Sequence, residues 1–577
     1  MNIKKSLFYC ILILSLIVFS CKVSEKNKKK SLPAISNSNR LMIDGIFIDA
    51  NKEKLLGNYK NALELFSMVV SKDPENSAAL YEIARINQTQ KKNAEALLYA
   101  KKAAEISPEN IWFQLLLADL YNSNQQYKEA TKVWSTIIKK NPDNIDYYYD
   151  LANAYIYENN LMEAIKVYDI IEKKIGITEN ISLQKQKIYL TENKFDKAVQ
   201  ELEKLSAASP DDTRYFAMLA ELHMGKKMYD KALVYYNKIL DKDPNEKFIH
   251  ISLASYYREV GNKEKSYLEL KKGFENPTLE IDTKIQILLS YYSITEIYNE
   301  LKSQAFELSE ILVKTHPTEA KAFSIYGDFL YRDKKFIEAR EAFRKVNTID
   351  SSKYEVWETL LIVNSELNDT NALLTESERA IQLFPEQPLL YLFSGIANFQ
   401  ANNLKEAIRR LETGVKLVID NEKLEAQFYT YLGDIHYKNK DYPKAYESYN
   451  KTLEIDSENV YVLNNYTYYL SLQAVDLDRA EEMGRKLNTL IPNNPSYQDT
   501  YAWVFYKLGR YEDAKKWILK AIENGGTDND IIMEHCGDVF YKLGNKTEAF
   551  EYWMKAKKIG NGSEFLQKKI DEKKLYE

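Results

Sequence analysis

Apolar side chains recur along this chain at spacings of three, four and seven residues, which place them on one face of a helix. The stretch YYYDLANAYIYENNLMEAIKVYDII, residues 147–171, is an example, because Tyr148, Leu151 and Tyr155 follow these spacings. The pattern predicts amphipathic helices. It also predicts that at least half of the six tyrosines in this stretch pack inside the protein.

Glycine and proline are scarce, with 18 and 13 residues in a chain of 577. A sandwich, a barrel or a doubly wound sheet of this length would need more of these turn-forming residues. The composition therefore favours an all-α fold. The chain is long enough for several domains or for one extended array of repeats.

One phrase recurs along the chain, as in YKNALELFSMVVSKDP from Tyr59, YKEATKVWSTIIKKNP from Tyr127 and YDKALVYYNKILDKDP from Tyr229. Aligning the phrases on one small or apolar residue gives fifteen units, most of them 34 residues apart. The aligned residues are Ala62, Ala96, Ala130, Ala164, Ala198, Ala232, Ser266, Ala305, Ala339, Leu373, Ala407, Ala445, Ala480, Ala514 and Ala549. Proline follows the aligned residue by twelve positions in eight units.

The period and these residues resemble the tetratricopeptide repeat (TPR) family over essentially residues 43–561. The resemblance implies two antiparallel helices in each unit and an all-α, superhelical solenoid of about fifteen helix-turn-helix repeats. One unit of this size cannot bury its apolar face alone, so neighbouring units must stack. Small residues such as Ala152 and Ala164 let the two helices approach, and the rings of Tyr148 and Tyr168 fill the space around them.

Two insertions divide the predicted solenoid into three TPR arrays. They lie near Glu280 and at residues 421–423, which gives seven repeats at 43–280, four at 281–420 and four at 421–562. Ser266, Leu373 and an extra residue before Ala480 depart from the repeat pattern and mark candidate flexible points. Residues 563–577 have an apolar and a highly charged side, which predicts a C-terminal capping helix.

The N-terminus resembles a bacterial lipoprotein signal peptide. Lys4 and Lys5 precede an apolar run at residues 7–19, which is short for a membrane span, and the sequence VFSC that ends at Cys21 is similar to a lipobox. By this resemblance residues 1–20 are removed and Cys21 is lipidated, which anchors the chain stably in a membrane. An ordinary cleaved signal and an uncleaved anchor are the alternatives. Residues 21–40 are polar and predict a flexible tether after the lipidated cysteine.

The remaining cysteines and the charge agree with export. Cys10 lies in the signal, so Cys536 is the only free thiol of the mature chain and no internal disulfide can form. Loss of Lys4 and Lys5 changes the formal net charge from −5 to −7, which disfavours nucleic acid as a partner. Lys22 follows Cys21, where an aspartate would favour inner-membrane retention, so the resemblance implies a lipoprotein on the periplasmic face of the outer membrane.

The sequence contains no Walker loop, no GxSxG, no HExxH and no paired CxxC motif. His223 and His436 occupy core positions of their repeats. His535 and Cys536 are adjacent, so on a helix their side chains point about 100° apart and cannot share a metal ion. We therefore expect no enzyme activity, no cofactor and no metal site.

Once catalysis and metal binding are set aside, recognition of a partner is the function to consider. In the family that this chain resembles, four positions of the first helix of each unit line the concave face of the solenoid. The side chains that the resemblance assigns to partner binding are Tyr149, Asn153, Asp328, Tyr331, Asp434, Tyr437, Asp499, Trp503, Tyr506, Glu534, Asp538 and Tyr541. Carboxylates beside rings in the C-terminal half suit a basic, extended peptide or helix. The alternative is that Gly-Asp pairs such as Gly433-Asp434 are consensus residues that imply no ligand.

Together these patterns predict a lipid-anchored scaffold or adaptor that holds proteins of an envelope assembly, secretion or transport machine. A periplasmic protein that binds carbohydrate or peptidoglycan, with exposed tyrosines stacked on sugar rings, is the leading alternative. A regulatory subunit of an envelope enzyme is a third hypothesis.

Overall fold

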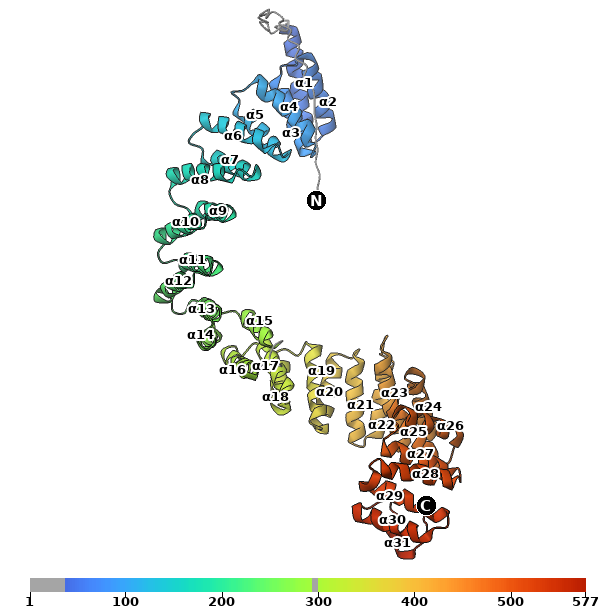
Figure 1. The fold of residues 1–577 in the computed structure, drawn as a ribbon. Coiled ribbons are helices and arrows are strands. Elements are labelled where there is room, and N and C mark those ends of the chain that lie inside the picture. The colour runs from blue at the N-terminus through green and yellow to red at the C-terminus, as the bar shows by residue number, and fades with distance from the viewer. Residues whose placement is uncertain (1–36, 293–298) are drawn as a thin grey trace, which may run out of the picture. The chain divides into compact units, whose positions relative to one another are not determined.

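A computed structural model gives the fold of this chain and describes residues 37–292 and 299–577. All regular structure within these ranges is helical (Figure 1). Two compact units are present, one ending at Pro244 and the other beginning at Asn245. The predictions for residues 1–20, for lipidation of Cys21 and for most of the tether concern residues outside the described ranges.

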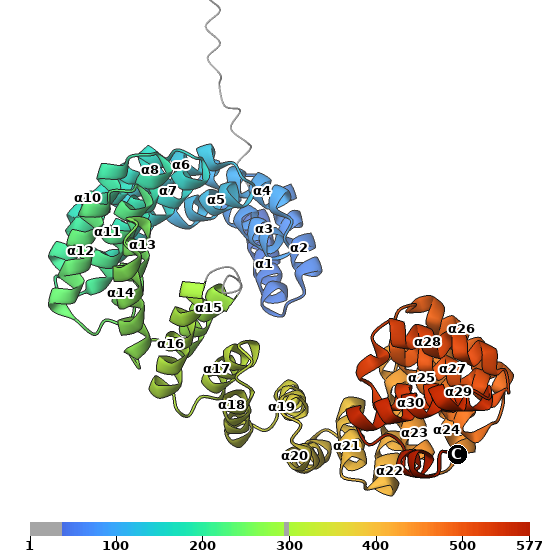
Figure 2. The same cartoon turned by 60° about the horizontal axis from the view of Figure 1, so that its bottom comes forward.

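The first unit holds twelve helices in six consecutive pairs. They are α1 (Asn37–Leu55), α2 (Tyr59–Lys72), α3 (Ser77–Thr89), α4 (Asn93–Ile106), α5 (Ile111–Ser123), α6 (Tyr127–Lys140), α7 (Ile145–Tyr157), α8 (Leu161–Ile175), α9 (Glu179–Thr191), α10 (Phe195–Ala208), α11 (Thr213–Gly225) and α12 (Tyr229–Lys242). Figure 2 shows that the pairs follow a curve, with the odd-numbered helices on its inner, concave side.

The second unit continues the pairs from α13 and ends with one short helix. Its helices are α13 (Ile249–Glu259), α14 (Lys263–Glu275), α15 (Ile281–Tyr292), α16 (Asn299–Thr315), α17 (Ala320–Arg332), α18 (Phe336–Ile349), α19 (Tyr354–Glu366), α20 (Thr370–Leu383), α21 (Pro388–Gln400), α22 (Leu404–Val415), α23 (Glu422–Lys438), α24 (Tyr442–Ile455), α25 (Val460–Gln473), α26 (Leu477–Leu490), α27 (Pro495–Lys507), α28 (Tyr511–Glu523), the 3₁₀ turn η1 (Gly526–Asp528), α29 (Asp530–Lys542), α30 (Lys546–Ile559) and α31 (Leu566–Glu572). Counted over both units, the described residues form the fifteen predicted helix pairs.

The helical pairs depend on the small residues at which the repeats were aligned. Ala62, Ala130 and Ala232 have no exposed surface, because the partner helix of each pair packs directly on them. In the opening tyrosine stretch Tyr148 and Tyr168 are buried, which confirms that rings of this cluster belong to the core.

The turn between the two helices of a repeat uses a left-handed backbone at one fixed position. It recurs every 34 residues at Gly57, Lys91, Gln125, Asn159, Asn193, Lys227 and Gly261, all with φ between 56° and 80°. Glycine reaches this region without a steric penalty, and asparagine tolerates it better than most residues. The extra residue before Ala480 is absorbed in the same way, because Ala474 and Asp476 both adopt positive φ.

The structure differs from the predicted boundaries at two places. Helix α1 begins at Asn37, so residues 37–40 of the predicted tether form the first turn of the helix whose buried side chains begin at Ile43. The boundary between the two compact units lies at 244/245, one repeat before the seam predicted near Glu280. The insertion at 421–423 instead lengthens α23 to 17 residues. No described helix is long and apolar enough to span a membrane.

Candidate functional site

The Gly-Asp pairs of the first helices have a structural role within their own repeats. A Cβ atom on Gly433 would lie 2.4 Å from the ring of Tyr449, so glycine makes room for that ring. The hydroxyl of Tyr449 then donates to Oδ1 of the adjacent Asp434 at 2.6 Å. The same arrangement recurs at Gly537, where the ring is Trp553. In both repeats the glycine leaves space for a ring from the second helix, and the neighbouring carboxylate accepts a hydrogen bond from that ring residue.

Asp434 is also contacted by the following repeat. Tyr461 on α25 donates its hydroxyl to Oδ2 of Asp434 at 2.7 Å. Burial raises the pKa of Asp434, and the two tyrosine hydroxyls oppose that shift. Among the described residues no lysine, arginine or histidine forms an ion pair with this carboxylate. Tyr437, one turn further along α23, stacks on Tyr469 with ring centroids 3.6 Å apart.

Three of the predicted partner-binding residues pack together around His535 instead of facing solvent. Nδ1 of His535 on α29 donates to Oδ1 of Asp499 on α27 at 2.8 Å. The ring of His535 stacks on Trp503 at 4.0 Å, and Trp503 stacks on Tyr506 at 4.5 Å. Burial lowers the pKa of His535, but the Asp499 carboxylate outweighs it and raises the pKa above its ordinary value. Asp499 therefore already has a hydrogen-bond partner within its own unit.

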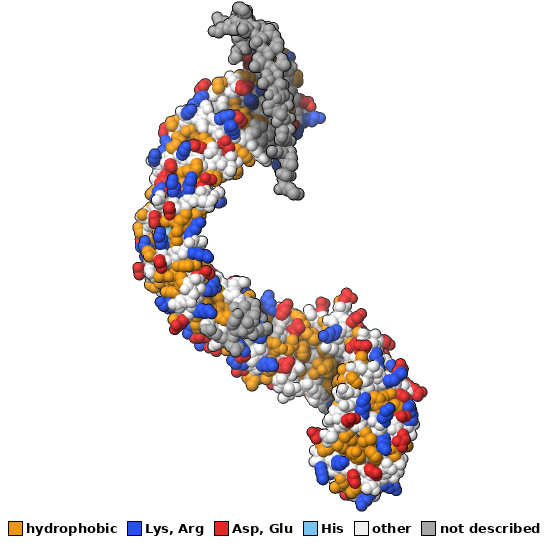
Figure 3. Space-filling view, viewed as in Figure 1, with side chains coloured by type: hydrophobic (Ala, Val, Ile, Leu, Met, Phe, Trp, Pro, Cys, Tyr) orange, Lys and Arg blue, Asp and Glu red, His pale blue; other side chains and the backbone are white. Residues whose placement is uncertain are grey.

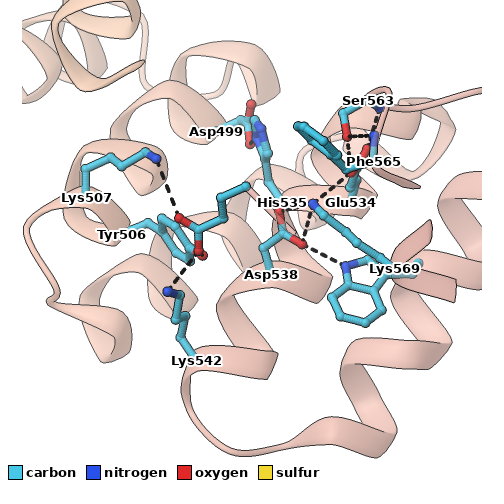
Figure 4. Close-up of polar contacts among 12 residues, drawn as sticks. Asp499, Tyr506, Lys507, Glu534, His535, Asp538, Lys542, Ser563, Phe565 and Lys569 are labelled. Carbon is cyan, nitrogen blue, oxygen red and sulfur yellow. Dashed lines mark hydrogen bonds and ion pairs between the residues drawn. The ribbon is translucent and has the colours of Figure 1, made fainter. Parts of the chain in front are cut away.

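Two further carboxylates, Glu534 and Asp538, hold the buried ammonium of Lys569 from α31 (Figure 4). Nζ of Lys569 lies 2.8 Å from Oε1 of Glu534 and 2.7 Å from Oδ2 of Asp538. Asp538 also accepts the indole N–H of Trp553 at 2.8 Å. Within residues 563–577, which were predicted to form a capping helix, α31 spans seven residues and covers the carboxylates that were predicted to attract a basic partner.

Glu577 contacts side chains of α27 and α29 in the same region. The side chain of Glu577 accepts the hydroxyl of Tyr506 and lies 2.8 Å from Nζ of Lys542. A second lysine, Lys507, lies 3.8 Å from this carboxylate. Asp499, Trp503, Tyr506, Glu534 and Asp538 are consequently all buried in the structure. This corrects the expectation of an open acidic surface at α27 and α29, because internal cations and rings already satisfy these side chains.

Of the other predicted partner-binding residues, Asp434 is as buried as Asp499, and the rest are more accessible. Tyr149 and Asn153 lie on α7 of the first unit, where Tyr149 is half-buried and Asn153 is exposed. Asp328 and Tyr331 lie half-buried on α17, and burial raises the pKa of Asp328 to about 6. The remaining residue, Tyr541 on α29, is half-buried and stacks on Trp553. Whether these residues bind a partner stays a prediction.

An open groove that the sequence analysis missed runs across α21, α23 and α25. Leu389, Leu392, Phe393 and Ile396 of α21 line it, together with Asp434 and Tyr461, and its volume is about 500 Å³. Hydrophobic side chains also gather over α19 and α21 in Figure 3. A sequence signal for this groove exists, because Leu389, Leu392 and Ile396 occupy concave positions of their repeat, and three apolar residues at such positions of one helix indicate an apolar surface.

The described residues contain no group of three or more histidine, cysteine, aspartate or glutamate side chains that could hold a metal ion. His223 and His436 are buried, as their core positions predict, and so is Cys536. Burial raises the pKa of the Cys536 thiol far above its ordinary value, so this thiol is not activated as a nucleophile.

Family models of the tetratricopeptide repeat match this chain in several ranges, namely 56–111, 87–155, 189–256, 426–459 and 497–524. Among known proteins, the protein O-mannosyl-transferase TMTC3 of Homo sapiens is 22% identical over 266 residues, which cover 44% of this chain and 29% of that protein. The TPR repeat-containing protein MJ1428 of Methanocaldococcus jannaschii is 23% identical over 375 residues, covering 61% of this chain and 65% of its relative. The matches therefore span less than two thirds of the length of either relative.

A solved structure of a tetratricopeptide repeat protein from Parabacteroides merdae is also similar, with 18% identity and a TM-score of 0.26. The match covers 48% of this chain and 99% of the other. The matched repeat models lie in both compact units, and the described residues form an all-α solenoid of fifteen helix pairs that is similar to the tetratricopeptide repeat family.

Proposed function

We propose that this protein is a non-enzymatic scaffold that holds a segment of a partner protein in the groove formed by α21, α23 and α25. The observation that carries this proposal is the open apolar groove of about 500 Å³ beside Asp434. Leu389, Phe393 and Ile396 remain half-exposed there, although most other residues of α21 are buried. Partly exposed apolar side chains in a concave surface are typical of a protein-binding groove.

The groove favours a partner segment with aliphatic side chains and one basic residue. Aliphatic groups would cover the side chains of α21, and burial of that surface would supply most of the affinity. A lysine or arginine next to them would pair with Asp434, which accepts two tyrosine hydroxyls but has no cationic partner among the described residues. Asp328, on α17 of the same unit, is a second half-buried carboxylate that a basic residue of the partner would neutralise.

We also propose that acyl chains on Cys21 hold this scaffold at the membrane of a bacterial cell envelope, on the periplasmic face of the outer membrane. The support is the sequence of residues 1–21, where two lysines, a short apolar run and the VFSC sequence follow one another. A scaffold in that place would serve an assembly, secretion or transport machine of the envelope.

A photo-crosslinking residue at position 393 should capture a protein in cells, whereas the same residue at position 337 should not. Phe393 lines the groove, while Ile337 is an exposed apolar residue on α18, outside the groove. In the purified complex we expect Ile396→Ser to weaken binding roughly tenfold or more, since it removes a contact worth about 1.5 kcal/mol or more. Ile337→Ser is the matched control and should bind normally.

Mass spectrometry of the adducts decides between the hypotheses. Protein adducts that depend on position 393 support the scaffold, and co-purifying glycan would favour the carbohydrate-binding alternative. Equal capture at positions 393 and 337 would mean that the groove does not select a partner.

The Cys21→Ala variant should no longer incorporate labelled palmitate and should leave the detergent-soluble membrane fraction. Both effects are expected because a thiol at Cys21 would be the attachment point of the lipid. The Cys10→Ala variant is the control, since Cys10 lies within the segment that is removed. Unchanged labelling of Cys21→Ala would exclude the lipid anchor.

A further inference from the structure

Helix α1 is apolar on two opposite sides. One side carries Ile43 and Ala50, which are buried against α2. The opposite side carries Leu41, Ile48 and Leu55, whose exposed fractions are 75%, 66% and 83%. A spacing of seven residues keeps these three side chains in one line along the helix. No other described helix of the first unit exposes three large apolar residues with this spacing.

The exposed line has a hollow of about 500 Å³ at its C-terminal end. Phe47, Ile48, Leu55 and Leu56 provide its apolar walls, and Asn51 and Lys52 complete it. An exposed helix surface of this kind costs free energy in water and usually marks an interaction site. It is bordered by polar residues, among them Asp44 and Lys52, which are themselves exposed. The polar border suits contact with a shallow interface and does not suit insertion into a bilayer core.

Only fifteen residues, 22–36, separate Cys21 from the first residue of α1. Such a segment spans at most about 55 Å even when fully extended. A lipid on Cys21 would therefore hold α1 close to the bilayer and give its exposed side chains a high effective concentration there. The segment also contains Lys26, Lys28, Lys29 and Lys30, which anionic headgroups attract.

From these observations we infer that the exposed line of α1, formed by Leu41, Ile48 and Leu55, lies on the surface of the membrane that carries the lipid anchor. The ligand of this surface is the headgroup and upper acyl region of a phospholipid bilayer. The inference rests on the lipid anchor of the proposed function and adds a second membrane contact. Two contacts orient the first repeat on the membrane, whereas a single lipid only keeps it nearby.

The experiment uses the acylated full chain in vesicles of phosphatidylethanolamine and phosphatidylglycerol. One variant carries Ile48→Cys and a control carries Val234→Cys, an exposed apolar site on α12 of the same unit. Both receive an environment-sensitive fluorophore. The label reaches only the introduced thiol, because Cys536 is buried and Cys21 is acylated. We expect a blue shift at residue 48 and loss of its emission when the vesicles contain nitroxide lipids, with neither effect at residue 234.

Three results would contradict the inference. If the two labels behave alike on vesicle-bound protein, the inference is wrong although the anchor holds. If the blue shift at residue 48 appears without vesicles and grows with protein concentration, a second copy of the chain covers α1 and the inference is overturned. If the parent protein takes up no labelled palmitate, the anchor and the inference both fail. Thermal melts equal to those of the parent would verify that Ile48→Cys leaves the fold intact.

Discussion

Replacing Lys569 by alanine is expected to lower the free energy of unfolding of the last repeat by about 3 to 5 kcal/mol. The ammonium of Lys569 lies between Glu534 and Asp538, and all three residues are almost fully buried. Removing one member of a buried charge pair leaves its partners desolvated and uncompensated. The cost should therefore greatly exceed that of deleting a surface lysine, which is at most about 1 kcal/mol.

The effect of Lys569→Ala should be local, because each repeat of a solenoid contacts only its neighbours. Hydrogen exchange of the backbone amides in α29 and α30 should accelerate strongly, while the exchange of α17 to α20 should stay unchanged. Lys568→Ala is the matched control, since Lys568 is exposed on the same helix. Equal exchange rates in the two variants would mean that the buried charge cluster does not stabilise the C-terminal end.

This cluster changes how the predicted acidic surface should be tested. Neutralising Asp499 or Asp538 removes a partner of His535 or Lys569. A loss of binding in such variants would therefore not show whether the long-range attraction of a basic partner or the local fold had been lost. Asp328 has no ion pair among the described residues, and Asp434 has none either. Salt-dependent attraction of a basic partner should therefore be sought at these two carboxylates.

The fold could be predicted from the sequence because its determinants are local and repeated. Ala62, Ala96 and Ala130 recur every 34 residues and all have at most 1% of their surface exposed, since each provides a close contact between two helices. The same contact is repeated fifteen times, so a departure in one unit did not obscure the pattern. Ser266 shows how such a departure is accommodated, because it is buried and donates its hydroxyl to the carbonyl of Ala254 at 2.7 Å.

The burial of the predicted site residues could not be predicted in the same way. The concave position of Asp538 follows from the repeat, but its burial depends on Lys569, which lies 31 residues later in a segment outside the repeat pattern. Periodicity contains no information on such a contact. The groove of α21 was missed for another reason, since Leu389 and Ile396 are ordinary residues of an apolar helix and only their concave positions distinguish them.

A second buried lysine provides the other large expected effect. Lys185 lies on α9 at the position that Leu151 holds in the preceding repeat, and only 1% of its surface is exposed. Its Nζ lies 2.7 Å from Asp169, 2.7 Å from Glu172 and 3.1 Å from Glu201. Burial lowers the pKa of Lys185, but the bonds to these carboxylates outweigh it and raise the pKa above its ordinary value.

Lys185→Ala should therefore destabilise the fifth repeat by about 3 kcal/mol, mainly because the buried carboxylate of Glu201 loses its buried cation and keeps only the partly exposed Lys204, 2.9 Å away. Urea unfolding and hydrogen exchange of α9 and α10 would measure the loss, with Lys187→Ala on the exposed side of α9 as the control. The double variant Lys185→Leu/Glu201→Leu should recover much of the stability, because apolar residues can replace a buried ion pair at little cost. If the double variant is no more stable than Lys185→Ala, the loss comes from packing, and the charge cluster of the fifth repeat is not its cause.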